Sequence, residues 1–390
     1  MTRQKYEIHA SDMASFKRCR VLWNYTSPLR RHLEVAFPPV FFFLGSGVHA
    51  ALAAYYERGV DPVTAFKLWY WWRKQRYAGS GHGLSTEQSL KYAEQAKLGI
   101  GMLKHYASVY PLEKEVFELV LAESFFSVPI RSLGGRRSAH YYAAGTFDGV
   151  VVDRNGHYWL LEHKTYKQVR GEGQFDLSDQ AKMYIYAAQE QFGLPVQGVV
   201  YNILRKKIPS RPMELQRGGL SRSKGIDTTY EVYLDEVKRL GYAPSDYADI
   251  LGRLQERGNT FFYRFQIRKS PKEMKLFQKL LYITAREMCR PNLILYPCND
   301  DWQCRNCWFS EPCVMEQAGH RSMAEDWLDL NTHQRSYRAD RVDFDFAVAR
   351  RAYQIVKEMN APPYAPPNAQ PQTSFKLVIK PPKGGVEGSE

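Results

Sequence analysis

Two acidic residues and a lysine lie on neighbouring strands of one predicted hairpin, and this arrangement constrains the fold more than any other feature of the chain. The residues are Asp148, Glu162 and Lys164. Apolar and β-branched residues at 150–153 and 158–161 predict the two strands, and an Asn-Gly pair between them favours a tight turn. Because successive side chains of a strand point to opposite faces, Glu162 and Lys164 share a face and Asp148 can lie opposite Glu162.

These three side chains predict chemistry on a phosphodiester. Two carboxylates directed at one point suit a hard divalent cation such as Mg²⁺, which prefers oxygen ligands. A lysine beside them can orient or deprotonate an attacking water, or neutralise a phosphate oxygen. The spacing is a short pattern, and the alternative is an ordinary hairpin with two solvated acids and a surface lysine.

Three further motifs accompany the hairpin. His49 lies in Gly-Ser-Gly-Val-His at the start of a predicted helix over 45–57. Gln180 and Tyr184 are four residues apart on a predicted helix over 177–191, so they share a helix face. The third motif is a set of cysteines, Cys304-x2-Cys307-x5-Cys313, with a lone Cys19 near the N-terminus. Taken singly, the histidine, glutamine and tyrosine also fit ordinary structural positions on helices.

Together and in this order, the motifs resemble the RecB-like branch of the PD-(D/E)XK nucleases. The resemblance is greatest to the iron–sulfur subgroup, which includes the CRISPR-associated RecB-like exonucleases, their phage-borne relatives and the AddB nuclease domain. It spans residues 19–313. It implies an α/β, restriction-endonuclease-like core, a mixed sheet flanked by helices, with a helical, cysteine-ligated subdomain formed by the N- and C-terminal parts. Phe147 stands where the family name has proline.

The resemblance also implies roles for individual residues. The metal ligands would be His49, Asp148, Glu162 and the main-chain carbonyl of His163, and the catalytic residues Asp148, Glu162, Lys164, Gln180 and Tyr184. An imidazole among carboxylates makes Mn²⁺ as suitable as Mg²⁺. Lys164 has a reference pKa of about 10.4, so we expect it to position groups and stabilise charge. Gln180 and Tyr184 would hold Lys164, the water or the DNA backbone.

The cysteines predict a metal centre, because thiolates select zinc or iron–sulfur clusters. One Cys-x2-Cys pair with a distant partner, together with the resemblance, favours a [4Fe–4S] cluster. Its ligands would be Cys19, Cys304, Cys307 and Cys313, with structural Zn²⁺ as the alternative. Cys298 could replace Cys19, and we expect Cys289 to be a buried helix residue.

The charge of the chain favours a polyanionic partner. The net charge is +13 and the isoelectric point is near 9.3. Seven of the basic residues fall within 205–224, where Glu214 is the single acid. Arg205, Lys206, Lys207 and Arg211 are therefore candidate DNA contacts on a phosphate-tracking arm, and a solvated basic loop is the alternative. The Trp-rich run at 69–76 could stack on single-stranded bases, although aromatic runs on a helix more often form core.

The sequence divides into five segments. They are an N-terminal segment (1–44) carrying Cys19, a nuclease core (45–290) with a basic insertion around 205–230, a cysteine segment (291–320), a helical extension (321–360) and a flexible Pro/Gly-rich tail (361–390). Further helices are predicted at 13–24, 62–76, 86–110 and 271–288, strands at 116–128, 196–203 and 260–267, and a linker at 37–43. The β-prone run at 375–380 could bind a protein partner.

We therefore expect a metal-dependent exonuclease acting on DNA ends. The resemblance implies single-stranded DNA with 5′ to 3′ polarity, in recombination, replication or repair, in a phage or cellular setting. The alternatives are a CRISPR spacer-acquisition factor, a non-catalytic DNA-binding or assembly subunit of the same fold, and a zinc-stapled adaptor. No apolar run is long enough to span a membrane, and the N-terminus lacks an apolar signal core, so a cytoplasmic protein is expected.

Overall fold

The protein is represented by a computed structural model that describes residues 4–35, 40–79, 85–168, 173–334 and 351. The predicted tail over 361–390, with its β-prone run, lies outside the described residues. So does most of the 321–360 extension. No described helix is both long and apolar enough to cross a membrane.

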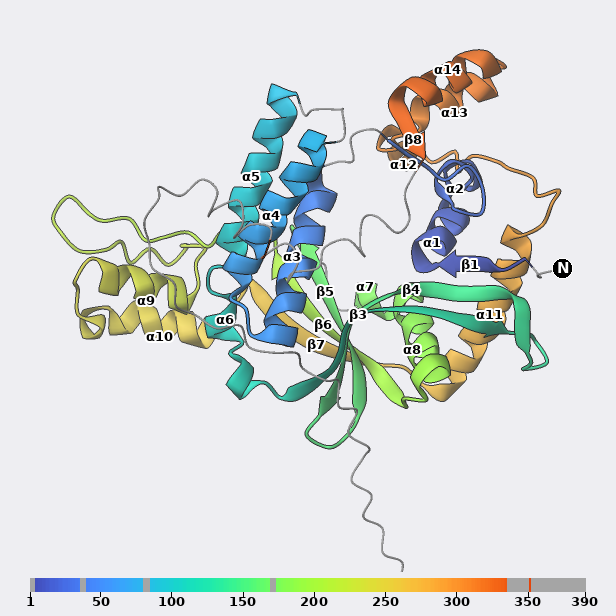
Figure 1. Cartoon of the computed structure of the whole chain (residues 1–390). Coiled ribbons are helices and arrows are strands. Elements are labelled where there is room, and N and C mark those ends of the chain that lie inside the picture. Colours follow the sequence, from blue (N-terminus) through green and yellow to red (C-terminus); the bar gives the residue numbers. More distant parts are fainter. Residues whose placement is uncertain (1–3, 36–39, 80–84, 169–172, 335–350, 352–390) are drawn as a thin grey trace, which may run out of the picture.

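A six-stranded mixed sheet forms the centre of the molecule (Figure 1). The predicted hairpin is present as β4 (Arg137–Asp153) and β5 (Tyr158–Tyr166), which pair antiparallel with Val150 opposite Leu160. The remaining strands are β3 (Phe117–Arg131), antiparallel to β4; β1 (Tyr6–His9), parallel to β4; β6 (Val196–Arg205), parallel to β5; and β7 (Phe262–Arg268), antiparallel to β6. The mixed sheet predicted from the sequence is confirmed.

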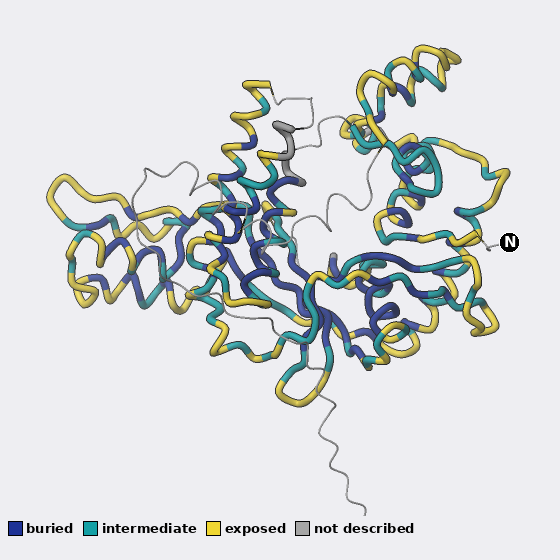
Figure 2. The backbone as a smooth tube through the Cα atoms, in the orientation of Figure 1, coloured by how far each residue is buried: buried dark blue, intermediate teal, exposed yellow. Residues whose placement is uncertain are grey.

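Helices cover both faces of this sheet (Figure 1). One face packs against α8 (Asp179–Phe192), α11 (Pro271–Met288) and α1 (Ala10–Arg18). The other face packs against a helical layer that contains α3 (Val40–Arg58), α4 (Pro62–Gly79) and α5 (Thr86–Leu103), and the short α6 (Tyr106–Val109) and η1 (Leu112–Lys114) follow. Figure 2 shows the backbone buried mainly along the strands and the helix faces turned toward them.

The crossover helix α8 follows from the pairing of β5 with β6. Parallel strands cannot be joined by a tight turn, so a helix carries the chain back across the sheet. The Ser178 side chain accepts a hydrogen bond from the Ala181 amide at 3.3 Å and begins the helix. Gly193 adopts a left-handed φ of +67° and ends it, a conformation that glycine accepts without steric cost.

Close packing of α3 against α4 requires a glycine just before His49. A Cβ on Gly47 would lie 2.6 Å from the Phe66 ring and 2.7 Å from the Trp69 ring. Trp69 is buried and packs 4.7 Å from Phe43, ring centre to ring centre. The core interpretation of this aromatic run therefore fits Trp69. The predicted linker over 37–43 is wrong at its end, because α3 already begins at Val40.

The first predicted helix is two helices in the structure. Cys19 adopts an extended conformation (φ −159°, ψ 116°) and separates α1 from α2 (Arg20–Thr26). Its sulfur accepts a hydrogen bond from the Leu22 amide at 3.4 Å and so begins α2. The helix also begins earlier than the predicted residue 13, because α1 starts after His9 and Asp12 lies inside the first turn.

The N- and C-terminal parts of the described chain pack together. The C-terminal part comprises α12 (Asp301–Arg305), α13 (Ser310–Gln317) and α14 (Arg321–Asn331), and a short sheet pairs β2 (Leu33–Val35) with β8 (Thr332–Gln334). Tyr25 stacks on Phe309 with ring centres 5.1 Å apart, and Leu328 joins them in a small buried cluster. The expected contact between the two ends is therefore present.

The basic stretch 206–224, expected to form a loop or extended arm, contains turns and an isolated bridge but no helix, and the helices of the insertion lie beyond it. Between β6 and β7 the chain forms α9 (Tyr230–Arg239), the short η2 (Pro244–Tyr247) and α10 (Ala248–Arg257). These elements share a small apolar core that includes Leu220, Tyr233 and Ile250. They extend to one side of the nuclease core (Figure 1).

Candidate active site

Three acidic residues lie side by side on adjacent strands. The pairing of Gly149 with Leu161 places Asp148 of β4 opposite Glu162 of β5, as predicted. On the other edge of β4, the pairs around Asp148 place Glu123 of β3 opposite it. Asp148 and Glu162 are buried, with 8% and 5% of their surfaces exposed, which excludes the alternative of two solvated acids.

His49 completes the group from the helical layer. Its Nδ1 lies 3.0 Å from Asp148 Oδ1. The other oxygen of Asp148 accepts a hydrogen bond of 2.9 Å from the main-chain amide of His163. One possible ligand atom from each of His49, Glu123 and Asp148 lies within 4.8 Å of the other two. Nitrogen and carboxylate oxygens at this separation suit Mg²⁺ or Mn²⁺.

Glu162 lies beside this group and is tied to the predicted lysine. Its Oε1 accepts hydrogen bonds from Lys164 Nζ at 2.6 Å and from Gln180 Nε2 at 3.0 Å. Lys164 Nζ also donates to Gln180 Oε1 at 3.1 Å. The structure therefore brings together all three residues, with Gln180 supplied by the first turn of α8.

Burial and mutual charge set the protonation of these groups. Burial raises the pKa of the Glu162 carboxyl, and the neighbouring Asp148 raises it further. Burial also opposes the charge on Asp148, but His49 outweighs it and holds the pKa of Asp148 well below its usual range. For Lys164, burial is likewise outweighed by the nearby carboxylates, so its pKa is raised. Lys164 therefore carries a proton at neutral pH, as a charge-stabilising role requires.

Glu123 is a candidate site residue that the sequence did not indicate. Its backbone has a φ of +40°, a left-handed conformation that side-chain-bearing residues rarely adopt. Such a conformation costs about 1–3 kcal/mol and often occurs at functional sites. The strand pattern of β3 carries no signal for it, because an exposed glutamate is unremarkable on a half-buried strand.

The predicted Tyr184 lies in the core of the domain. It is buried against Phe126 and Phe147, with ring centres 5.2 and 5.7 Å away. A Cβ on Gly145 would lie 2.8 Å from the Phe126 ring and 3.2 Å from that of Tyr184, so this close approach needs glycine. Tyr184 thus packs under the strand that carries Asp148.

Most of the predicted DNA-contact residues form ion pairs within the insertion. Arg205 donates to both carboxylate oxygens of Asp227, at 2.8 and 3.0 Å, and Lys207 lies 2.5 Å from the same carboxylate. Arg211 pairs with Glu236 at 3.3 Å. Burial lowers the pKa of Lys206, and the charge of nearby Lys167 lowers it further.

A cavity of about 450 Å³ lies at the carboxyl ends of β5 and β6. Its lining includes Tyr166, Lys167, Arg205 and Tyr263. Tyr166 follows Lys164 by two residues, and its carbonyl accepts a hydrogen bond of 2.7 Å from the Lys206 amide. The cavity therefore joins the end of the active-site strand to the start of the insertion.

Five cysteines gather between the two ends of the described chain. The Sγ atoms of Cys298 and Cys304 are 3.6 Å apart. Burial opposes the charge on the Cys298 thiol, but its surroundings, which include Cys304 and Cys19, lower its pKa. Cys307 and Cys313 line the small cluster around Phe309, and both interact electrostatically with Cys19. Cys298, which the sequence left ambiguous, therefore belongs to the group. Cys289 is separate and partly buried at the end of α11, where burial raises its pKa to about 11.

The family model for the PD-(D/E)XK nuclease superfamily matches residues 8–314 of the chain. The match covers every residue of the site described above and the cysteines from 19 to 313. No curated protein matches the chain with significant similarity.

Proposed function

This chain belongs to the PD-(D/E)XK nuclease superfamily, and we propose that it is a metal-dependent DNA exonuclease of the RecB-like type. Members of this superfamily use divalent metals. The buried Asp148 and Glu162 supply the expected donors, and the partly buried Lys164 supplies the cation. We further propose that it degrades single-stranded DNA from an end, with 5′ to 3′ polarity. Its cellular role would be the processing of DNA ends during recombination, replication or repair, in a cell or a phage.

The observation that carries this proposal is the convergence of His49, Glu123 and Asp148 beside the Glu162–Lys164 pair. We propose that Mg²⁺ or Mn²⁺ would be held by four side chains and one main-chain carbonyl. These are the side chains of His49, Glu123, Asp148 and Glu162 and the carbonyl of His163. A bound divalent ion would lower the pKa of an attacking water and offset charge on the phosphate.

The chain's own residues would then orient the reaction. The ammonium group of Lys164, held between Glu162 and Gln180, would neutralise an oxygen of the scissile phosphate. The amide of His163 fixes one oxygen of Asp148, which leaves the other toward His49. Tyr184 would act through packing, by supporting the strand that carries Asp148.

End-labelled single- and double-stranded DNA, incubated with and without Mn²⁺, tests this function. We expect metal-dependent release of short products from one end of single strands, and no cleavage by the Asp148→Ala or Glu162→Ala protein. Those variants should still bind DNA. Metal-independent binding without cleavage by the unaltered protein would instead indicate the non-catalytic subunit. Parallel reactions with DNA labelled at the 5′ end or at the 3′ end determine the polarity of cleavage directly.

We also propose that Cys19, Cys304, Cys307 and Cys313 ligate a [4Fe–4S] cluster. The support is the soft donor set and its position between the two ends of the chain, where a cluster would close a very long loop. Such a site would stabilise the contact between α2 and α13, in which Tyr25 of α2 stacks on Phe309 at the start of α13.

One distance favours zinc as a second candidate. Two thiolates on one tetrahedral zinc lie about 3.8 Å apart, given a Zn–S bond of about 2.3 Å. The Cys298 and Cys304 sulfurs are 3.6 Å apart. Iron and zinc content of protein purified without oxygen separates the two: about four irons per chain supports the cluster, and stoichiometric zinc without iron contradicts it.

A further inference from the structure

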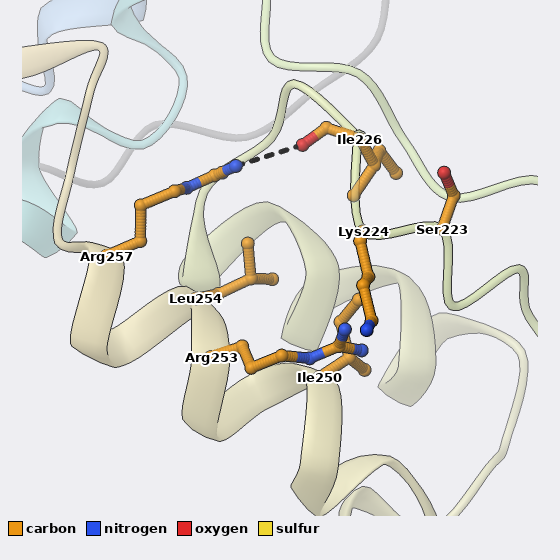
Figure 3. A pocket seen from close by; sticks show the side chains of 7 residues that line it. All are labelled: Ser223, Lys224, Ile226, Ile250, Arg253, Leu254 and Arg257. Carbon is orange, nitrogen blue, oxygen red and sulfur yellow. Dashed lines mark hydrogen bonds between the residues drawn. The ribbon is translucent and has the colours of Figure 1, made fainter.

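The insertion between β6 and β7 contains a pocket that the nuclease site does not use. The pocket has a volume of about 120 Å³ and lies between the 223–226 loop and α10. Ile226, Ile250 and Leu254 form apolar walls, and Ser223 offers a hydroxyl at the rim (Figure 3). The remaining lining residues are all cations: Lys224, Arg253 and Arg257.

The cations of this pocket are only partly compensated. Lys224 and Arg253 line the same pocket from the loop and from α10 (Figure 3). Asp249 lies 3.6 Å from Arg253, but the same carboxylate is shared with Arg222 at 3.2 Å. Among the described residues, no carboxylate is within ion-pair distance of Lys224. The three lining cations and Arg222 thus carry four positive charges beside the one negative charge of Asp249, which favours an anion in the pocket.

Arg257 is oriented without being neutralised. Its guanidinium donates to the Ile226 carbonyl at 3.2 Å and to the Thr228 carbonyl. Carbonyl groups accept hydrogen bonds but carry no net charge, so the positive charge of Arg257 adds to that of the pocket. These bonds also fix the 226–228 segment against α10 and make the pocket part of the folded insertion.

The rest of the insertion is less suited to an anion. Arg205 and Lys207 are both paired with Asp227, and Arg211 is paired with Glu236. Three of the four cations predicted as DNA contacts are therefore compensated, whereas Lys224 and Arg257 have no carboxylate partner among the described residues. The sequence could not indicate this, because Lys224 and Arg253 are far apart along the chain.

We propose that this pocket binds a backbone phosphate of the DNA substrate at a distance from the scissile phosphate. The proposal rests on the proposed nuclease function. Lys224 and Arg253 would contact the phosphate oxygens, and the apolar walls would accept the adjoining sugar. The cavity lined by Tyr166 and Arg205 lies between the active-site strand and this insertion, so one strand of DNA could follow both.

Binding to single-stranded oligonucleotides of increasing length tests the proposal in the full chain. The measurements use an Asp148→Asn background, so that the DNA is not cut. We expect Lys224→Ala with Arg253→Ala to weaken binding of long oligonucleotides and to leave the shortest ones unaffected. The slope of log affinity against log salt should fall by about 1.4, or about 0.7 for each lost phosphate contact.

Two matched variants make the result specific. Lys238→Ala with Lys275→Ala removes the same charge from exposed positions on α9 and α11, and should leave the slope nearly unchanged. Lys224→Arg with Arg253→Lys keeps the charge in the pocket and should restore most of the long-oligonucleotide affinity. A loss shared equally by the exposed-charge variant would overturn the proposal, since net charge alone would then account for binding.

Three further outcomes would also overturn it. The first is an unchanged slope in the pocket variant, and the second is an equal loss for short and long oligonucleotides. The third concerns small anions: the unaltered protein binds inorganic phosphate or a deoxynucleotide, and the pocket variant loses that binding but keeps its DNA affinity. This outcome would identify a site for free phosphate. The nuclease proposal is tested separately. It fails if the unaltered protein shows no metal-dependent cleavage of DNA.

Discussion

Asn202 Nδ2 lies 2.8 Å from the Nδ1 atom of His163, on the residue that separates Glu162 from Lys164. Arg264 Nε, which can only donate, lies 3.1 Å from Asn202 Oδ1 and so fixes the orientation of the amide. The amide NH₂ must therefore donate to His163, which leaves His163 neutral with its proton on Nε2. Burial lowers the pKa of His163 to about 3, in agreement with a neutral ring.

Replacing Asn202 with leucine should destabilise the protein by about 1–3 kcal/mol, because His163 and Arg264 would each lose a buried partner. Chemical denaturation measures the free energy of unfolding. Gln189→Leu, on an exposed position of α8, is the control and should change stability little. We also expect slower cleavage at saturating metal, since the His163 amide positions Asp148. Wild-type stability and rate in Asn202→Leu would show that the network supports neither the fold nor the site.

Glu123 offers a test that separates ligand chemistry from backbone strain. Replacing it with glycine relieves the φ of +40°, so the metal-free protein should gain up to about 1–2 kcal/mol of stability. Glu123→Gln keeps the strain and should leave that stability nearly unchanged. Both variants should bind Mn²⁺ more weakly in calorimetric titration. Undiminished Mn²⁺ affinity in both would remove Glu123 from the ligand set.

Metal binding should weaken as the pH falls. Burial opposes a proton on His49, but the Asp148 carboxylate outweighs burial and raises the pKa of His49. The protonated His49–Asp148 pair therefore stabilises the metal-free protein below the ordinary histidine pKa of about 6.5, and this stabilisation is lost as the pH rises through the raised value. A metal must displace that proton.

The increase in melting temperature caused by Mn²⁺ should accordingly grow from pH 6 to pH 8, which a thermal shift assay can follow. His49→Asn removes the titrating group. The Mn²⁺-induced increase in the melting temperature of this variant should be smaller and should vary less with pH. If the unaltered protein showed an equally large metal-induced shift across this pH range, the metal would not be displacing a proton from His49.

The sequence predicted those parts of the site that depend on local geometry. Asp148, Glu162 and Lys164 follow from strand alternation and an Asn-Gly turn, and Gln180 follows from helix spacing and the resemblance. Glu123 did not, because its place beside Asp148 depends on the register of β3 against β4. Cys19 shows a different limit: helix propensity runs through it, yet its extended backbone and sulfur cap divide the helix.

The insertion shows the same limit on a larger scale. Its helices were not predicted, although α10 repeats apolar residues at Ile250, Leu251 and Leu254 with helical spacing. Two prolines and a Gly-Gly pair favoured a loop over 205–224, and no element was predicted for the residues that follow. Pairing of Arg205 and Lys207 with Asp227 joins residues about twenty positions apart, and only the folded chain reveals which cations remain uncompensated.

Serine variants of single cysteines should identify the ligands of the metal centre. Cys304→Ser should lose the bound metal and destabilise the contact between α2 and α13, because the predicted centre joins the two ends of the domain. Cys289→Ser is the matched control: that thiol is partly buried against the main core, away from the other five, and its loss should leave the metal content unchanged. Metal analysis and absorption spectra of protein purified without oxygen give both readouts.

The comparison of Cys19 with Cys298 decides the fourth ligand. If Cys19 is the ligand, Cys19→Ser should lose iron and visible absorption, and Cys298→Ser should retain both. Loss of iron in Cys298→Ser alone would exchange the two assignments. Stoichiometric zinc in the unaltered protein, lost in both Cys298→Ser and Cys304→Ser, would instead fit the 3.6 Å separation of their sulfurs and replace the cluster with a zinc site.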